Sequence, residues 1–257
     1  MKSITGFLIF TSLVLLSITS CKTSETIHDD CDGAHWFYSG NTGPDHWKDL
    51  CSGYANCGHQ RQSPVNISGA VSNESLSAIN FNYNNTRVEI ENNGHTIEFV
   101  CDPGSTLHIN GTTYELLQFH YHGLSEHQLN GIHHPLEVHF VHKATADDYA
   151  VIGIFYDEGD ANPLFSSFLE HFPTEVGTYE DHSVEIDLST LLPDNKSYFH
   201  YSGSLTTPPC SEVVDWYVLQ HTVSASEAQI NAFQAILNNN YRPIQELNGP
   251  VIYEFNE

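Results

Sequence analysis

Basic residues are scarce in this sequence of 257 residues. It has 8 lysines and arginines against 32 aspartates and glutamates, so its formal net charge at pH 7 is -24. A nucleic-acid-binding protein needs positive charge to neutralise phosphates, and no basic patch supplies it here. We therefore expect no nucleic-acid partner. The acidic excess favours a solubilising surface, with adaptation to high salt and attraction of calcium as open alternatives.

Long apolar runs are missing except at the amino terminus. Lys2 precedes an apolar run from Ile4 to Ile18, which predicts a secretory signal peptide over residues 1–20. The run is short and no stop-transfer pattern follows, so it does not predict a transmembrane span. Cys21 stands where a bacterial lipobox requires a cysteine, so a lipid anchor there is one prediction, and ordinary cleavage near Ser20 is the alternative. We expect an exported protein: a periplasmic or outer-membrane lipoprotein if bacterial, and otherwise a secreted one.

Internal repeats, coiled-coil heptads and low-complexity blocks are also lacking, which excludes repeat and fibrous architectures. Residues 21–34 are polar and predict a flexible tether. Residues 35–257 suit one large domain with a sizeable core.

Cysteines number only six. Export permits disulfides, but the spacing does not fix which cysteines pair. If Cys21 carries a lipid, five cysteines remain and at least one should be unpaired.

Alternating apolar and polar residues predict a strand-rich domain. Asn110-Gly111 between two such runs predicts a hairpin. The run at 150–156 is apolar throughout, so it predicts a buried central strand. A helix is expected over 225–237, with Ser224 and Glu227 as its capping box, and a second near 163–171. The expected strands are 81–83, 87–90, 96–100, 106–109, 116–122, 136–142, 150–156, 183–187 and 213–219. The fold class is thus mainly β (α+β), with a large, mostly antiparallel sheet and a few peripheral helices.

Two of these strands carry the most informative pattern. Because strand side chains alternate between faces, Gln118, His120 and His122 share one face of the first strand. Glu137, His139 and Val141 share one face of the second. If the strands pair antiparallel, the three histidines converge, and three nitrogen ligands with an open fourth position suit a catalytic zinc ion. Gln118 and Glu137 are placed to accept hydrogen bonds from His120 and His139.

The histidine pair alone is a weak motif, because about one His-x-His pair is expected by chance in a chain this rich in histidine. A set of longer motifs in fixed order is far more specific, and with it the chain resembles the α-class carbonic anhydrases from about His35 to Phe255. The motifs are Gly43-Pro44-Asp45-His46-Trp47, Gln62-Ser63-Pro64-Val65-Asn66-Ile67, Asn92-Asn93-Gly94-His95, Gln118-Phe119-His120-Tyr121-His122, Ser125-Glu126-His127, Glu137-Val138-His139, Ser204-Leu205-Thr206-Thr207-Pro208-Pro209-Cys210 and Asn240-Tyr241-Arg242-Pro243.

The resemblance implies that His120, His122 and His139 bind one Zn²⁺ per chain, and that the zinc turns water into hydroxide that attacks carbon dioxide. It implies that the backbone carbonyl of Asn240 supports His122. It also implies that Thr206 accepts a hydrogen bond from the hydroxide while its own proton goes to Glu126, so that Glu126 and Thr206 are catalytic.

Carbon dioxide is uncharged and suits an apolar wall. The resemblance gives this wall as Val141, Val151, Leu205, Val214 and Trp216, with Thr206 and Thr207 as further substrate-binding residues. Strand alternation independently puts Val141 on the His139 face.

The resemblance gives His95 as a catalytic proton shuttle, since imidazole titrates near neutrality. Tyr38 and Asn93 match residues that order the water path to it. The next position of that path is Glu98 here rather than an amide, so the path is expected to differ.

Exported members of the family imply a Cys57–Cys210 disulfide, and Cys31–Cys51 is a second candidate. The resemblance also implies cis peptides at Ser63-Pro64 and Pro208-Pro209. The expected function is reversible hydration of carbon dioxide to bicarbonate and a proton. The alternatives are a non-catalytic binding protein of the same fold and a histidine-rich metal-sequestering protein. The oligomeric state stays open, with a dimer possible.

Overall fold

The computed structural model describes residues 31–145, 147–173, 175–177, 179–180 and 185–257. The predicted signal peptide, most of the predicted tether and Cys21 lie outside these residues. Within the described part of the chain, no helix is long and apolar enough to cross a membrane.

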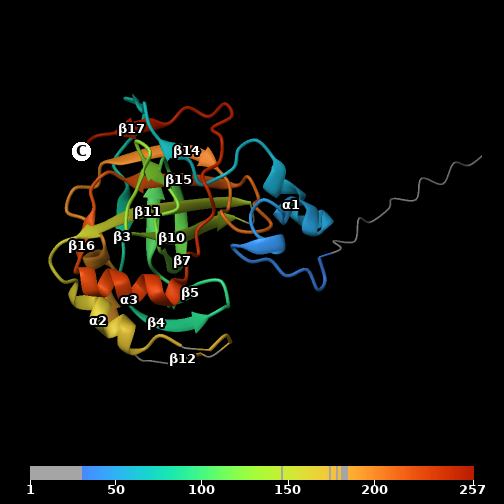
Figure 1. Cartoon of the computed structure of the whole chain (residues 1–257). Helices are drawn as coiled ribbons and strands as arrows, with labels where there is room; N and C mark the ends of the chain where they lie inside the picture. The colour runs from blue at the N-terminus through green and yellow to red at the C-terminus, as the bar shows by residue number, and fades with distance from the viewer. Residues whose placement is uncertain (1–30, 146, 174, 178, 181–184) are drawn as a thin grey trace, which may run out of the picture.

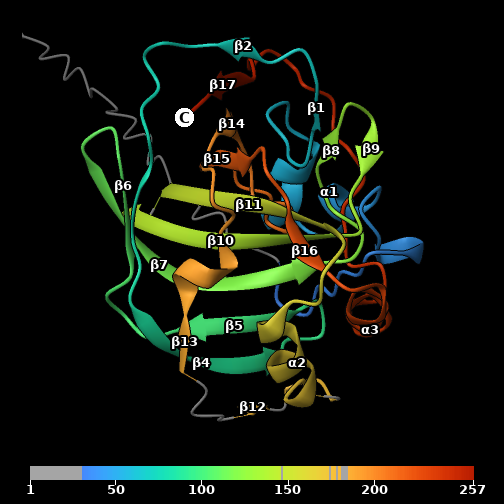
Figure 2. The same cartoon turned by 90° about the vertical axis from the view of Figure 1, so that its left-hand side faces the viewer.

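A large twisted sheet forms the body of the molecule (Figures 1 and 2). Its strands follow the order β12-β4-β5-β7-β10-β11-β15-β14-β17-β2, and β3, β6, β13 and β16 pair with members of this path. The strands are β2 (Val71–Ser72), β3 (Asn80–Asn82), β4 (Asn85–Asn92), β5 (Ile97–Cys101), β6 (Thr106–Ile109), β7 (Thr112–His122), β10 (Leu136–Thr145), β11 (Asp148–Glu158), β12 (Tyr179–Glu180), β13 (Glu185–Asp187), β14 (Tyr198–Gly203), β15 (Val214–Leu219), β16 (Val223–Ala225) and β17 (Tyr253–Phe255). A small separate sheet contains β1 (Asn66–Ile67), β8 (Gln128–Leu129) and β9 (Ile132–His133).

The predicted sheet class is confirmed. Most neighbouring strands are antiparallel, while β11 runs parallel to β15 and β16, and β17 runs parallel to β2. β11 lies between β10 and β15 and is buried from residue 150 to residue 156, as its continuous apolar run predicts. Asn110 and Gly111 both have positive φ and join β6 to β7, which confirms the hairpin.

β7 contains a β-bulge at Leu117. Residues Val141 and His142 of β10 are consecutive, but they pair with Gln118 and Leu116 of β7, so Leu117 is an extra residue. The bulge changes which face the side chains occupy: Tyr114 and Leu116 are buried before it, and Phe119 and Tyr121 after it. After the bulge, Gln118, His120 and His122 therefore lie on the opposite face from this core.

The helices are few and peripheral. They are α1 (Trp47–Leu50), α2 (Pro163–Glu170) and α3 (Glu227–Leu237), with 3-10 turns η1 (Gly40–Thr42), η2 (Ser52–Gly58) and η3 (Leu188–Leu191). α2 confirms the helix expected near 163–171. It packs against α3 (Figure 1), where Asn162, which caps α2, donates its N–H to Gln229 of α3.

The predicted start of α3 is wrong by two residues. The capping box is Ser226 with Gln229, not Ser224 with Glu227. Both pairs satisfy the same sequence pattern. Val223–Ala225 instead forms β16 beside β11, and this pairing keeps the backbone extended past Ser224.

Two disulfides fix the amino-terminal segment. Cys57–Cys210 and Cys31–Cys51 are both present, and Cys101 is free and buried. The expected cis peptides at Ser63-Pro64 and Pro208-Pro209 are also present, with a further one at Gly123-Leu124. Trp47 of the amino-terminal segment is fully buried and clusters with Cys57 and Cys210.

Candidate functional site: three histidines on neighbouring strands

The pairing of β7 with β10 brings the three predicted histidines together. His139 lies directly opposite His120, and Glu137 lies opposite His122. One ligand nitrogen from each of His120, His122 and His139 lies within 4.8 Å of the other two.

Each imidazole is held by a hydrogen bond that leaves its other nitrogen facing the centre. His120 donates from Nδ1 to Gln118 Oε1 at 2.8 Å, and His122 donates from Nδ1 to the carbonyl of Asn240 at 2.6 Å. His139 donates from Nε2 to Glu137 Oε1 at 2.9 Å. The predicted supporting contacts of Gln118, Glu137 and Asn240 are therefore made. Two Nε2 atoms and one Nδ1 atom remain as lone-pair donors.

The surroundings disfavour the charged forms of His120 and His122. Burial, and then the neighbouring imidazoles, hold the pKa of His120 well below its ordinary value. Burial also lowers the pKa of His122. Burial raises the pKa of Glu137, but the imidazoles of His127 and His139 outweigh it and hold that pKa well below its usual range. A neutral imidazole is the form that binds a metal ion, so the lowered pKa values of His120 and His122 suit a metal site.

The chemistry of this donor set fits zinc. His122 Nε2 is buried and has no hydrogen-bond partner in the described structure, which is costly unless something binds it. Three imidazole nitrogens are a ligand set that zinc uses with a fourth position open. A second cluster, His127, Glu137 and His139, is a hydrogen-bonded chain instead. His127 bonds Glu137 Oε1 and the hydroxyl of Tyr201, each at 2.7 Å, so both of its nitrogens are already used.

The predicted hydrogen bond from Thr206 to Glu126 is not made. Thr206 and Glu126 are both buried, and Glu126 Oε1 accepts from the backbone N–H of Arg242 at 2.7 Å. Glu126 Oε2 has no hydrogen-bond partner among the described residues. It lies 3.6 Å from His122 Nε2 and 3.9 Å from His139 Nδ1, so this oxygen lies beside two of the three histidines.

The predicted apolar wall forms one cluster beside the histidines. Val151, Val214 and Trp216 are buried in it, and the half-buried Val141 and Leu205 pack against it. The Trp216 ring contacts that of His139, with centroids 4.8 Å apart. Thr207 is half-buried in the turn that ends at Cys210.

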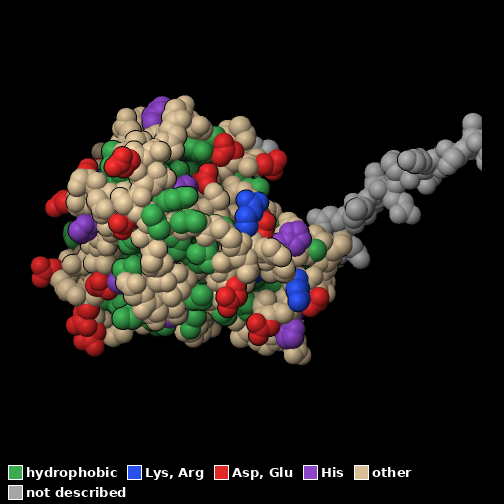
Figure 3. All heavy atoms as spheres, turned by 90° about the horizontal axis from the view of Figure 1, so that it is seen from above, with side chains coloured by type: hydrophobic (Ala, Val, Ile, Leu, Met, Phe, Trp, Pro, Cys, Tyr) green, Lys and Arg blue, Asp and Glu red, His purple; other side chains and the backbone are tan. Residues whose placement is uncertain are grey.

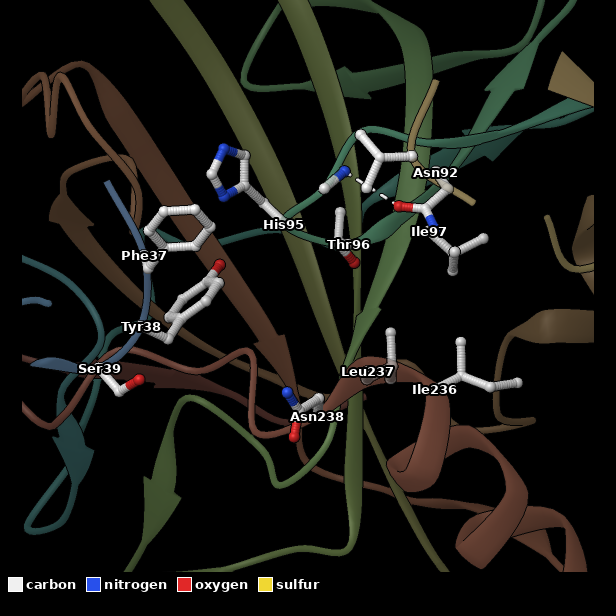
Figure 4. A pocket seen from close by; sticks show the side chains of 12 residues that line it. Phe37, Tyr38, Ser39, Asn92, His95, Thr96, Ile97, Ile236, Leu237 and Asn238 are labelled. Atoms are coloured by element: carbon white, nitrogen blue, oxygen red, sulfur yellow. Dashed lines mark hydrogen bonds between the residues drawn. The ribbon is translucent and has the colours of Figure 1, made fainter. Parts of the chain in front are cut away.

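His95 lines a pocket that His120, His122 and His139 do not line. Its ring stacks on Trp36, and this pocket of about 270 Å³ lies between the segment Phe37–Ser39 and the end of α3 (Figure 4). Its Nδ1 is buried without a partner, and burial lowers its pKa from the ordinary value of 6.5. Sequence reasoning missed Trp36, whose only signal was its place in an aromatic-rich segment.

The other predicted proton-path residues lie on adjoining elements. Asn93 donates from its side chain to Glu98 Oε2 at 3.3 Å, and Glu98 pairs with His120 across β5 and β7. Burial, and then Glu91, raise the pKa of Glu98. Burial, and then Glu126, raise the pKa of Tyr38 well above its ordinary value, which keeps its hydroxyl protonated.

The large mixed sheet and the three clustered imidazoles place this protein among those that build a candidate metal site from histidines on neighbouring strands. The family model of the eukaryotic-type carbonic anhydrases matches residues 42–256, and the chain belongs to this family. The carbonic anhydrase of Pectobacterium carotovorum is 40% identical over 223 residues, which cover 86% of this chain and 91% of that protein. The α-carbonic anhydrase of Thermovibrio ammonificans, solved with the inhibitor sulfanilamide, is 40% identical with a TM-score of 0.83, covering 86% of this chain and 99% of that one. Dioscorin dioA3 of Dioscorea japonica is 30% identical over 263 residues, which cover 97% of this chain and 94% of that protein.

Proposed function

We propose that this protein is a zinc-dependent carbonic anhydrase that interconverts carbon dioxide and bicarbonate. The observation that carries the proposal is the set of three individually oriented imidazole nitrogens within 4.8 Å of one another, from the buried His122 and His139 and the half-buried His120, in a chain of this family. When bound to His120, His122 and His139, zinc would supply Lewis acidity that generates hydroxide near neutral pH, a general property of carbonic anhydrases.

The residues around the ligands would position the reactants. Carbon dioxide has no charge, so the apolar cluster containing Val141, Val151 and Trp216 would accommodate it more readily than it would accommodate water. The free Oε2 of Glu126 is available to accept a hydrogen bond from the Thr206 hydroxyl. The Thr206 oxygen would then accept a hydrogen bond from the attacking oxygen.

His95 would carry the released proton to buffer. Because burial lowers its pKa, its ring is neutral near pH 7 and can accept a proton. Three observations support this path: Tyr38 lines the same pocket as His95, Asn93 bonds Glu98, and Glu98 lies opposite His120.

Stopped-flow measurement of carbon dioxide hydration, before and after zinc removal and readdition, tests the proposal. We expect one tight zinc per chain and activity that follows zinc content. His120→Ala should lose both, whereas His108→Ala, an exposed histidine on β6, should keep both.

Two other outcomes would contradict the proposal. Several weakly bound zinc ions without activity would favour metal sequestration. One tight zinc without hydration activity would favour a non-catalytic binding protein.

We also propose that the protein is exported, because its two disulfides form and persist in oxidising compartments. Mass spectrometry of the mature amino terminus tests the predicted lipid anchor at Cys21. An unmodified Cys21 would contradict that prediction. Acidic side chains are spread over the face shown in Figure 3 and basic ones are sparse. This face therefore lacks the positive charge that binding to nucleic acid would need.

A further inference from the structure

Arg242 is the only buried lysine or arginine among the described residues. Its guanidinium donates to the carbonyls of Cys57 at 3.0 Å and Ser63 at 2.8 Å, and to Gln62 Oε1 at 2.9 Å. It also lies over the ring of Trp47, 5.4 Å from the centroid. One side chain therefore fixes both ends of the segment from Cys57 to Ser63. A planar fork with several donors is needed for this, and lysine cannot reproduce it.

Gln62 extends this contact to the loop that carries Thr206. Its amide Nε2 donates to the carbonyl of Cys210 at 3.2 Å and to Glu212 Oε1 at 3.3 Å. Cys210 closes the turn that begins at Thr207, by a backbone bond of 2.8 Å. The Cys57–Cys210 disulfide joins the same two segments. The loop after Thr206 is thus held through Gln62 by the Arg242 fork.

The backbone of Arg242 holds the other partner of the proposed catalytic pair. Its N–H donates to Glu126 Oε1 at 2.7 Å, and the bond is buried. This fixes one carboxylate oxygen and leaves Oε2 free for a second donor. The neighbouring Asn240 carbonyl accepts from His122, so the same short segment also orients one proposed zinc ligand.

We propose that Arg242 is a positioning residue, whose guanidinium keeps the Thr206 loop and the Glu126 carboxylate in a fixed relative position. This inference rests on the proposed function, because it assigns Arg242 to the alignment of that catalytic pair. In this role Arg242 does not contact the substrate and acts only through Glu126 and Gln62.

A double-mutant cycle tests the inference. Hydration of carbon dioxide is measured in strong buffer for Arg242→Lys, Glu126→Gln and the double variant, with zinc content and thermal unfolding recorded for each. Arg87→Lys, at an exposed position on β4, is the matched control. We expect Arg242→Lys to lower kcat/KM by about tenfold or more with one zinc per chain retained. In the Glu126→Gln background the same substitution should cost less than about twofold, because the pair acts as a unit.

Gln62→Glu provides a second route if Arg242→Lys does not fold. It keeps the acceptor for Arg242 but removes the N–H that donates to Cys210, so it should also lower kcat/KM with zinc retained. An equal loss for Arg242→Lys in both backgrounds, or full activity in Gln62→Glu, would overturn the inference.

Failure of the proposed function can be told apart from failure of this inference. If the wild-type protein binds zinc but does not hydrate carbon dioxide, the function fails, and crystal structures of the two variants decide the positioning role. A shift of the Glu126 carboxylate relative to the Thr206 loop supports it, and an unchanged arrangement overturns it.

Discussion

The imidazole of His95 lies flat against the indole of Trp36, with ring centroids 3.6 Å apart and planes 7° apart. The indole removes water from one face of the imidazole, and burial disfavours its charged form. Trp36 therefore affects the proton affinity of the group proposed to carry protons.

Replacing Trp36 with alanine should raise the pKa of His95 toward its ordinary value, because the exposed ring can again be solvated. An NMR titration of the His95 ring protons measures this shift. Phe37→Ala is the matched control, since that ring lies farther away at 6.1 Å and is tilted. A pKa that stays depressed in Trp36→Ala would show that other groups cause the burial effect.

His95→Ala should reduce turnover by about tenfold or more in weak buffer and much less in strong buffer, because an external base can then accept the proton. Added imidazole should restore part of the loss. Steady-state hydration assays over a range of buffer concentrations measure this. An unchanged rate in weak buffer would remove His95 from the proposed proton path.

Glu126→Gln should lower kcat/KM by roughly 100-fold while zinc stays bound. If the single amide oxygen accepts from the Arg242 N–H, the amide NH2 takes the place of Oε2 and cannot accept a hydrogen bond from Thr206. Zinc content and hydration rate are measured together. Glu115→Gln, on the exposed face of β7, is the control and should keep full activity. Normal turnover in Glu126→Gln would exclude the proposed pair.

The two disulfides should differ in their contribution to stability. Cys57–Cys210 spans 153 residues and Cys31–Cys51 spans 20, so the chain-entropy model gives about 5 kcal/mol and about 3 kcal/mol respectively. Urea unfolding of the paired Cys→Ser variants measures both. A larger loss on removing Cys31–Cys51 would contradict this order.

Acid should destabilise the fold through His142. Its Nδ1 donates to the carbonyl of Phe140, its Nε2 accepts from Tyr83, and burial lowers its pKa to about 3. The folded pKa lies below the unfolded value of about 6.5, so the unfolded state binds more protons between the two. The stabilisation is complete above pH 6.5 and is lost as the pH falls through this window. His142 alone should cost about 2 kcal/mol between pH 7 and pH 5.

Urea unfolding at both pH values checks this cost. His142→Gln should be less sensitive to pH than the wild-type protein. His108→Gln, at an exposed site, should retain the wild-type sensitivity, and equal sensitivity in all three proteins would rule out His142 as the cause.

The expected strands and the shared face of the β7 histidines were predictable because they depend on local alternation, whereas β2, β14 and β17 of the same sheet were not predicted. Gln118, His120 and His122 share a face in any strand that covers them, and Asn110-Gly111 prescribes its own turn. The start of α3 was not predictable, since Ser224 and Ser226 offer equivalent caps and only the pairing of β16 with β11 decides between them. The orientation of Glu126 and the stack of Trp36 on His95 depend on contacts between distant segments, which no local pattern encodes.

The extra residue at Leu117 separates β7 into two parts that can vary independently. A one-residue insertion or deletion on the hairpin side of Leu117 can be absorbed where the pairing is already irregular. The same change within residues 118–122 would exchange the two faces, turning the histidines into the core and Phe119 and Tyr121 outward. Chain length is thus constrained over those five positions far more tightly than over the rest of the strand.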